Sequence, residues 1–243
     1  MQVSRWFFRL TLAASVTVLG RAQTPVKPAA GTVLPAASAT AGADAILRGG
    51  SVQWSQVPAR KISLNRTPPL FDTDEPAAAE ISTAEVRLLR AGGRLFVQLS
   101  WHDRTHDLAD LQAVPDTPPE KRFLKIPTEA EDRFFDAAAV MVPASPGSTI
   151  NPSLQMGDRG HPVHIYYWNS TRGAMLMDAA GRATTRRTGQ TFPAEAVYQN
   201  ARWVLTLELP DQPTGAPIAF AIWNGSQKDR DGRKYFSAWY TVE

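Results

Sequence analysis

The sequence predicts an all-β fold, an antiparallel β-sandwich with few short helices, on three observations. Several stretches alternate apolar and polar residues with the period of a strand rather than that of a helix. Glycines and 19 prolines separate these stretches at short intervals. Segments with helical spacing of apolar residues are scarce. Many short strands with frequent turns are typical of a sandwich.

The clearest local pattern is a β-hairpin. Residues 85–90 and 94–101 alternate in polarity, and Gly92 and Gly93 between them suit a tight two-residue turn. The other predicted strands are 136–143, 164–169, 192–198, 201–209, 218–223 and 236–242.

Helix is expected at two places only, 105–111 and 128–135. The second begins at Thr128 with Glu131 three residues on, the spacing of a capping box. The irregular stretch 103–127 is long for a compact domain, and such loops are often functional or face a partner.

The N-terminal part divides into two segments before the folded domain. Residues 1–22 have flanking arginines, a short apolar run and small residues at the end, which predicts a cleavable signal peptide and export to the periplasm. Residues 23–44 are rich in Ala, Pro, Thr and Ser and are expected to form a flexible linker. The sandwich domain is therefore placed at 45–243. No stable membrane span is expected after processing, because the apolar run is short.

Charge and cysteine content exclude several classes of function. The net charge is +3, and residues 1–22 hold three arginines and no acidic residue, so the remaining chain has a formal charge of zero. The net positive charge comes from residues 1–22, so it gives no reason to expect a nucleic-acid partner for the rest of the chain. The absence of cysteine excludes disulfides, Fe–S clusters, Cys-based zinc sites and covalent c-type haem.

Met156 lies in the sequence Gln-Met-Gly-Asp, next to Gly157, which would let the backbone approach a ligand closely. Its thioether is a soft, neutral ligand that suits haem iron or Cu(I). The alternative is a methionine that fills a gap in the core.

Lys234 follows Asp-Arg-Asp-Gly-Arg and precedes an aromatic strand. An amine ligates a metal only when neutral, and burial favours the neutral form. The alternatives are a solvated lysine at a strand end, and Lys228 as the ligand in its place. Histidines offer a further alternative, because His161 or His164 can replace either ligand or bind zinc or copper.

Catalytic patterns are lacking: there is no cysteine nucleophile, no Gly-x-Ser-x-Gly motif and no phosphate-binding loop. The chain is therefore expected to be non-catalytic.

Five motifs stand out along the folded part: Leu-Ser-Trp-His-Asp at 99–103, Asp-Ala-Ala-Ala-Val-Met-Val-Pro at 136–143, Met-Gly-Asp-Arg-Gly-His-Pro-Val at 156–163, Ile-Trp-Asn-Gly at 222–225 and Asp-Gly-Arg-Lys at 231–234. Together they resemble a known family, the haem b-binding gamma subunits of ethylbenzene dehydrogenase, dimethyl sulfide dehydrogenase and related molybdoenzyme complexes.

The resemblance implies a β-sandwich that binds one non-covalent haem b, with Met156 and Lys234 as axial ligands. It also implies electron transfer between the Fe–S subunit of a molybdoenzyme and a periplasmic c-type cytochrome, with the catalytic subunit as a further partner. The cofactor-binding residues that follow are Met156, Lys234, Gly157, Tyr166, Trp168, Trp223 and Tyr235, with Tyr167 a further candidate. A different class of function remains open, a carbohydrate- or ligand-binding sandwich module without haem, because seven tryptophans suit stacking on sugars.

Overall fold

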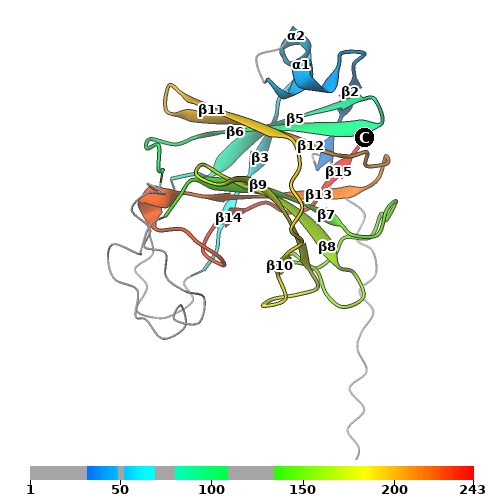
Figure 1. The fold of residues 1–243 in the computed structure, drawn as a ribbon. Helices are drawn as coiled ribbons and strands as arrows, with labels where there is room; N and C mark the ends of the chain where they lie inside the picture. The colour runs from blue at the N-terminus through cyan, green and yellow to red at the C-terminus, as the bar shows by residue number, and fades with distance from the viewer. Residues whose placement is uncertain (1–31, 49–51, 69–79, 109–133) are drawn as a thin grey trace, which may run out of the picture.

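The computed structural model describes residues 32–48, 52–68, 80–108 and 134–243. Two β-sheets stack face to face and form the body of the molecule (Figure 1). The predicted all-β sandwich is confirmed, since the helices among the described residues are two short segments, α1 (Ala43–Leu47) and α2 (Val52–Ser55), and one 3-10 turn, η3 (Gly225–Gln227). In the described part of the chain, no helix is long and apolar enough to cross a membrane.

The larger sheet has nine strands in the order β1-β15-β13-β7-β8-β9-β10, with β14 pairing to β13 and β4. Its strands are β1 Val33–Leu34, β4 Asn65–Arg66, β7 Ala137–Pro143, β8 Val163–Asn169, β9 Gly173–Ala179, β10 Arg186–Arg187, β13 Pro217–Trp223, β14 Tyr235–Phe236 and β15 Tyr240–Val242. All pairs in this sheet are antiparallel except β1 with β15.

The smaller sheet has six strands in the order β11-β12-β6-β5-β2, with β3 pairing to β5. Its strands are β2 Ala36–Ser38, β3 Arg60–Ser63, β5 Thr83–Ala91, β6 Arg94–His102, β11 Ala194–Gln199 and β12 Arg202–Pro210. The predicted Gly92-Gly93 hairpin is confirmed as the turn between β5 and β6, and both glycines have positive φ.

One hydrophobic core fills the space between the two sheets. Alternate residues of each strand point into it, for example Val140 of β7 and Leu205 of β12, both fully buried. The outer face of the six-stranded sheet is covered separately, because Ile46 and Trp54 of the two helices pack on Phe96 of β6. The outer face of the nine-stranded sheet has no such helices among the described residues.

The N-terminal boundary predicted at residue 45 is wrong. Strands β1 and β2 lie inside the segment expected to be a linker, where β1 pairs with β15 and β2 with β5. Backbone hydrogen bonds and the buried Leu34 hold this segment to both sheets, although its Ala-rich composition lacks a strand pattern. Residues 23–31 of the predicted linker and the predicted signal peptide lie outside the described residues.

The structure tests only part of the two predicted helices, 105–111 and 128–135. Residues 105–108 are not helical, because Asp103 and Thr105 form local side-chain bonds that fold this segment into an irregular turn. Most of the helix predicted at 128–135, and of the long loop 103–127, lies outside the described residues. The strand predicted at 236–242 is two strands, β14 and β15.

Candidate functional site

A pocket of about 650 Å³ lies on the outer face of the nine-stranded sheet, opposite the sandwich core. Its floor comes from alternate residues of β7, β8 and β13, and its walls come from the loops before β8, after β9 and before β14. Its lining includes Ala139, Met156, Tyr167, Thr185, Ala221, Trp223 and Lys234. The volume is in the range of cofactor and ligand pockets, roughly 300–1,000 Å³.

Small side chains form one part of the floor. Ala139 of β7 pairs with Ala221 of β13 on one side and with Tyr167 of β8 on the other. Ala219 also lines the pocket one pleat further along β13. Because alanine adds only a methyl group above the sheet, a planar ligand can lie close to these strands.

Met156 reaches the pocket from a tightly held loop. Its φ is +67°, a left-handed conformation that costs energy for a residue with a side chain and persists only where the surroundings enforce it. The Met156 carbonyl accepts a hydrogen bond from Gly181 N over 2.9 Å, which ties the loop to the segment after β9. Trp239 Nε1 donates to the Pro152 carbonyl over 2.8 Å at the start of the same loop.

The position after Met156 requires a glycine, Gly157. Its φ is +76°, and a Cβ at this position would lie 2.7 Å from the His161 carbonyl oxygen. Gly157 does not line the pocket; its role in the structure is to turn the chain so that Met156 does.

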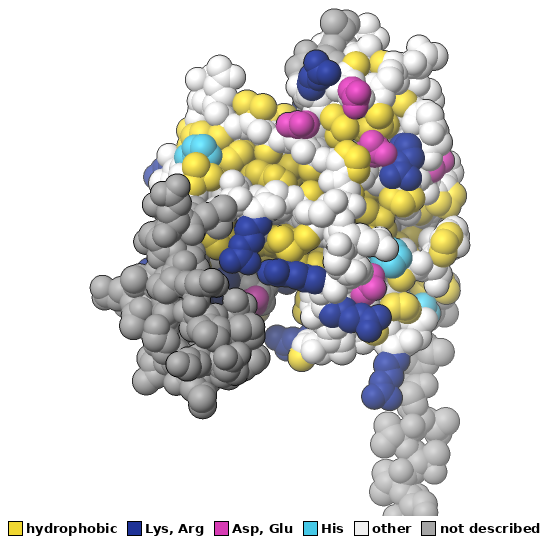
Figure 2. Space-filling view, viewed as in Figure 1, with side chains coloured by type: hydrophobic (Ala, Val, Ile, Leu, Met, Phe, Trp, Pro, Cys, Tyr) yellow, Lys and Arg dark blue, Asp and Glu magenta, His cyan; other side chains and the backbone are white. Residues whose placement is uncertain are grey.

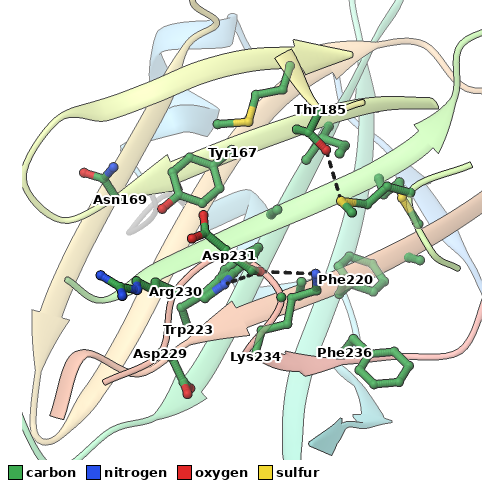
Figure 3. A pocket seen from close by; sticks show the side chains of 18 of the residues that line it. Tyr167, Asn169, Thr185, Phe220, Trp223, Asp229, Arg230, Asp231, Lys234 and Phe236 are labelled. Atoms are coloured by element: carbon green, nitrogen blue, oxygen red, sulfur yellow. Dashed lines mark hydrogen bonds between the residues drawn. The ribbon is translucent and has the colours of Figure 1, made fainter. Parts of the chain in front are cut away.

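The Met156 sulfur has a polar neighbour. Thr185 Oγ1 lies 3.1 Å from Sδ and donates a hydrogen bond to it (Figure 3). The sulfur is thus oriented by a residue that no pattern in the sequence singles out.

Lys234 enters the pocket from the other side, at the end of the loop before β14. Its backbone is fixed, because Lys234 N donates to Thr67 Oγ1 over 3.0 Å and its carbonyl accepts from Thr67 N over 2.9 Å. The side chain is half-buried, with Nζ 5.4 Å from the centre of the Trp223 ring and 3.5 Å from the Asp231 carbonyl (Figure 3). Burial lowers the pKa of Lys234, so the neutral amine is favoured relative to a lysine in water.

An aromatic pair forms one wall. The rings of Tyr167 and Trp223 meet edge to face, with centroids 5.3 Å apart, and Trp223 Nε1 donates to the Asp231 carbonyl over 3.2 Å. Both side chains are labelled in Figure 3, where Trp223 lies next to Lys234. They provide an apolar surface for a ring system and hold the loop that leads to Lys234.

Basic side chains gather at the pocket, where this face of the molecule is hollowed (Figure 2). The lining arginines are Arg172, Arg182, Arg187 and Arg230. Of the acidic lining residues, Asp229 is already paired with Arg66, at 2.7 Å. The site therefore suits a ligand with an apolar body and carboxylate groups.

The structure brings the predicted residues Met156, Tyr167, Trp223 and Lys234 together around one pocket. It does not bring Tyr166, Trp168 and Tyr235 there, since all three are buried in the core between the sheets. The reason is the alternation of strand side chains, which sends Tyr167 outwards and its two neighbours inwards.

The alternative ligands lie elsewhere. His161 is exposed and bonds to Asp158, and His164 bonds to Asp178 over 2.8 Å. Lys228 is exposed, in a left-handed turn. None of these three lines the pocket.

A soft thioether, an amine with a lowered pKa, an apolar floor and a basic rim converge on one cavity. This set fits a flat, iron-bearing ring with carboxylate substituents better than it fits a bare metal ion, for which two such ligands are few.

Comparison with known proteins gives related sequences along nearly the whole chain. The chain is 31% identical to a protein of Haloferax mediterranei named as a putative respiratory nitrate reductase heme subunit, across 94% of this chain and 78% of that protein. It is 28% identical to the chlorate reductase subunit gamma of Ideonella dechloratans, across 93% and 90% of the two chains. It is 27% identical to the dimethylsulfide dehydrogenase subunit gamma of Rhodovulum sulfidophilum, across 76% and 69%.

No protein-family model matches the chain. Among solved structures, a family 9 carbohydrate-binding module from Caldicellulosiruptor kristjanssonii aligns with 86% of this chain and 83% of its own, at a TM-score of 0.41 and 10% identity.

Proposed function

The chain belongs to the gamma-subunit family of molybdoenzyme complexes, and from this premise we propose that it is a non-catalytic electron-transfer subunit that binds one haem b in the outer-face pocket. Met156 and Lys234 are the proposed axial ligands. The observation that carries the proposal is that these two residues, far apart in the sequence, line the same cavity.

The donor atoms suit a haem that cycles between two oxidation states. When bound, haem supplies a one-electron couple. The thioether of Met156 is a ligand that raises the potential of such a couple. The amine of Lys234 is a ligand only when unprotonated, and its burial favours that form.

The remaining pocket residues account for binding and orientation. Ala139 and Ala221 leave room for a planar ring over the sheet, and Tyr167 and Trp223 contact its edge or face. Burial of the ring supplies most of the affinity, at roughly 25 cal/mol per Å² of apolar surface. Arg182 and Arg187 on the rim are proposed to pair with the two propionates.

The partners follow from the relatives, which are named as subunits of reductases and a dehydrogenase. We propose that this chain passes single electrons between the Fe–S subunit of a molybdoenzyme and a c-type cytochrome, and that the complex is periplasmic. The N-terminal residues 1–22 remain predicted as the signal peptide for this route.

The test is an absorption spectrum and a redox titration of the holo-protein and two ligand variants. Met156→Ala and Lys234→Ala are each expected to convert six-coordinate iron to a five-coordinate or newly ligated form, with shifted bands and a shifted potential. Lys228→Ala is the matched control for the lysine and Met175→Ala for the methionine, because neither residue lines the pocket.

Unchanged bands and potential in either ligand variant would remove that residue from the site. A purified protein that is colourless and is retarded on polysaccharide gels would contradict the haem proposal as a whole and favour the ligand-binding module.

A further inference from the structure

Three aspartates, none of which lines the outer-face pocket, cluster at one end of the sandwich. Asp103 follows β6, Asp136 directly precedes β7, and Asp107 lies in the turn after Asp103. One carboxylate oxygen of each residue lies within 4.8 Å of those of the other two. Segments of both sheets therefore meet at three acidic groups.

Two of the three aspartates, Asp103 and Asp136, are buried, and one carboxylate oxygen of Asp103 lacks a hydrogen-bond partner among the described residues. Asp103 is 2% exposed, and its Oδ2 is buried with no hydrogen-bond partner among the described residues. Its other oxygen, Oδ1, accepts bonds from Thr105, through the backbone N–H at 3.2 Å and Oγ1 at 3.3 Å. A buried carboxylate oxygen without a donor is costly, and it indicates a missing positive or donor group.

No positive side chain in the described part of the chain compensates the three carboxylates. Lys, Arg and His residues there form no ion pair with any of them. Burial, and after it the neighbouring charge of Asp136, raises the pKa of Asp103 to about 7. Acidic groups this close repel one another unless a cation or a proton lies between them.

The surrounding donors hold the carboxylates in place. Asp136 accepts from Gly225 N at 3.0 Å and from Trp203 Nε1 at 3.1 Å, and Ser226 N donates to Asp107 at 2.9 Å. Gly225 has no side chain at the point of closest approach, since a Cβ there would lie 2.5 Å from Asp107 Cβ. The three acids are thus fixed to the ends of β6, β7 and β13.

We propose that Asp103, Asp107 and Asp136 bind one divalent cation of the hard, oxygen-preferring kind, with Ca²⁺ as the fitting ion. Three carboxylates supply oxygen ligands, Thr105 Oγ1 lies among them, and water completes the six to eight oxygens that Ca²⁺ takes. Mg²⁺ fits less well, because it demands a near-ideal octahedron, whereas these oxygens are already constrained by backbone donors.

The cation would join the two sheets at this end and fix the start of the segment 225–234. That segment leads to Lys234, so the cation would also stabilise one wall of the outer-face pocket without touching it. The proposal does not depend on what the pocket binds.

The experiment is calorimetric titration of the EDTA-treated full chain with CaCl₂, together with thermal unfolding with and without Ca²⁺. We expect one Ca²⁺ per chain and a higher unfolding temperature when Ca²⁺ is present. Asp103→Asn, which keeps the shape but removes the charge, should weaken binding about tenfold or more, because ligand charge sets Ca²⁺ affinity. Asp44→Asn, at an exposed position on α1, is the matched control and should bind as the wild type does.

If Asp103→Asn does not fold, the half-buried Asp107→Asn takes its place. The proposal would be overturned if the wild type released or absorbed no heat on titration with CaCl₂ or MgCl₂ and its unfolding temperature did not change with either salt. An Asp103→Asn variant that unfolds at a higher temperature than the wild type under all conditions would overturn it as well, since the cluster would then share a proton instead of a cation.

Discussion

Ala138 and Ala139 are neighbours in β7 and lie on opposite sides of the nine-stranded sheet. Ala138 is fully buried in the core between the sheets, whereas Ala139 forms the floor of the outer pocket between Tyr167 and Ala221. One face of this strand therefore packs in the core and the other lines the pocket proposed for haem, so substitutions at the two positions can separate stability from the proposed binding.

Ala139→Leu should weaken haem binding and leave the fold intact. The larger side chain rises from the floor into the space proposed for the ring, and over-packing of this kind costs roughly 1–3 kcal/mol. Titration of the apo-protein with haem measures the affinity, and circular dichroism measures the fold. The matched change Ala138→Leu should instead lower the free energy of unfolding by roughly 1–3 kcal/mol, because it over-packs the core. Equal haem affinity in Ala139→Leu and the wild type would contradict the proposed floor.

Residues 136–143 illustrate what the sequence can and cannot predict. The run of apolar residues ended by Pro143 predicts the strand, and the structure confirms it. The sequence does not predict to which side of the sheet each side chain points, because both faces of β7 are buried and the usual alternation of apolar and polar positions is lost. The same ambiguity explains why the sequence suggests Tyr166, Tyr167 and Trp168 alike as pocket residues, although of these three only Tyr167 lines the pocket.

Other parts of the fold depend on contacts that are distant in the sequence. The Gly92-Gly93 hairpin is predictable because its turn is local, whereas β1 and β2 form only through backbone bonds to β15 and β5. Strand β9 is not predictable because all but one of its residues are half-buried and no alternation results. For the site, ligand chemistry suggests Met156 and Lys234, but Thr185 carries no sequence signal and is identified only by its contact with Met156.

Thr185→Val should loosen the Met156 loop without removing haem. The variant keeps the shape and loses the hydrogen bond to the sulfur, and a typical bond of this kind contributes about 0.5–1.5 kcal/mol. Haem affinity is expected to fall severalfold and the reduction potential to shift, whereas Thr185→Ser should retain the wild-type values. Thr191→Val, at an exposed position, controls for the change in side-chain type. If Thr185→Val and Thr185→Ser have the same haem affinity and reduction potential, the hydrogen bond from Thr185 to Met156 does not contribute to haem binding.

Arg66→Leu should strongly destabilise the segment that carries Lys234. Asp229 is fully buried and paired with Arg66 through two bonds, at 2.7 and 3.0 Å. Removing the arginine leaves a buried carboxylate without its main partner, which typically costs about 3–5 kcal/mol. Urea unfolding measures the loss. The double variant Arg66→Leu/Asp229→Asn should recover part of it, and a double variant no more stable than Arg66→Leu alone would show that the pair is not the cause.

Acidification should remove the Lys234 ligand before the protein unfolds. Burial lowers the pKa of this amine, and the positive charge of Arg182 adds to the effect while Asp231 opposes it. Because the folded-state pKa lies below the unfolded value, the folded chain holds fewer protons on this group, and its stability rises with pH between the two values. In the proposed holo-protein a proton would compete with iron for this nitrogen, so ligation by Lys234 would be favoured at high pH and lost as the pH falls. A spectrophotometric titration of the ferric protein should show this transition in the wild type and in Lys228→Ala but not in Lys234→Ala. A wild-type spectrum that stays constant until global unfolding, as judged by circular dichroism, would exclude a titrating lysine ligand.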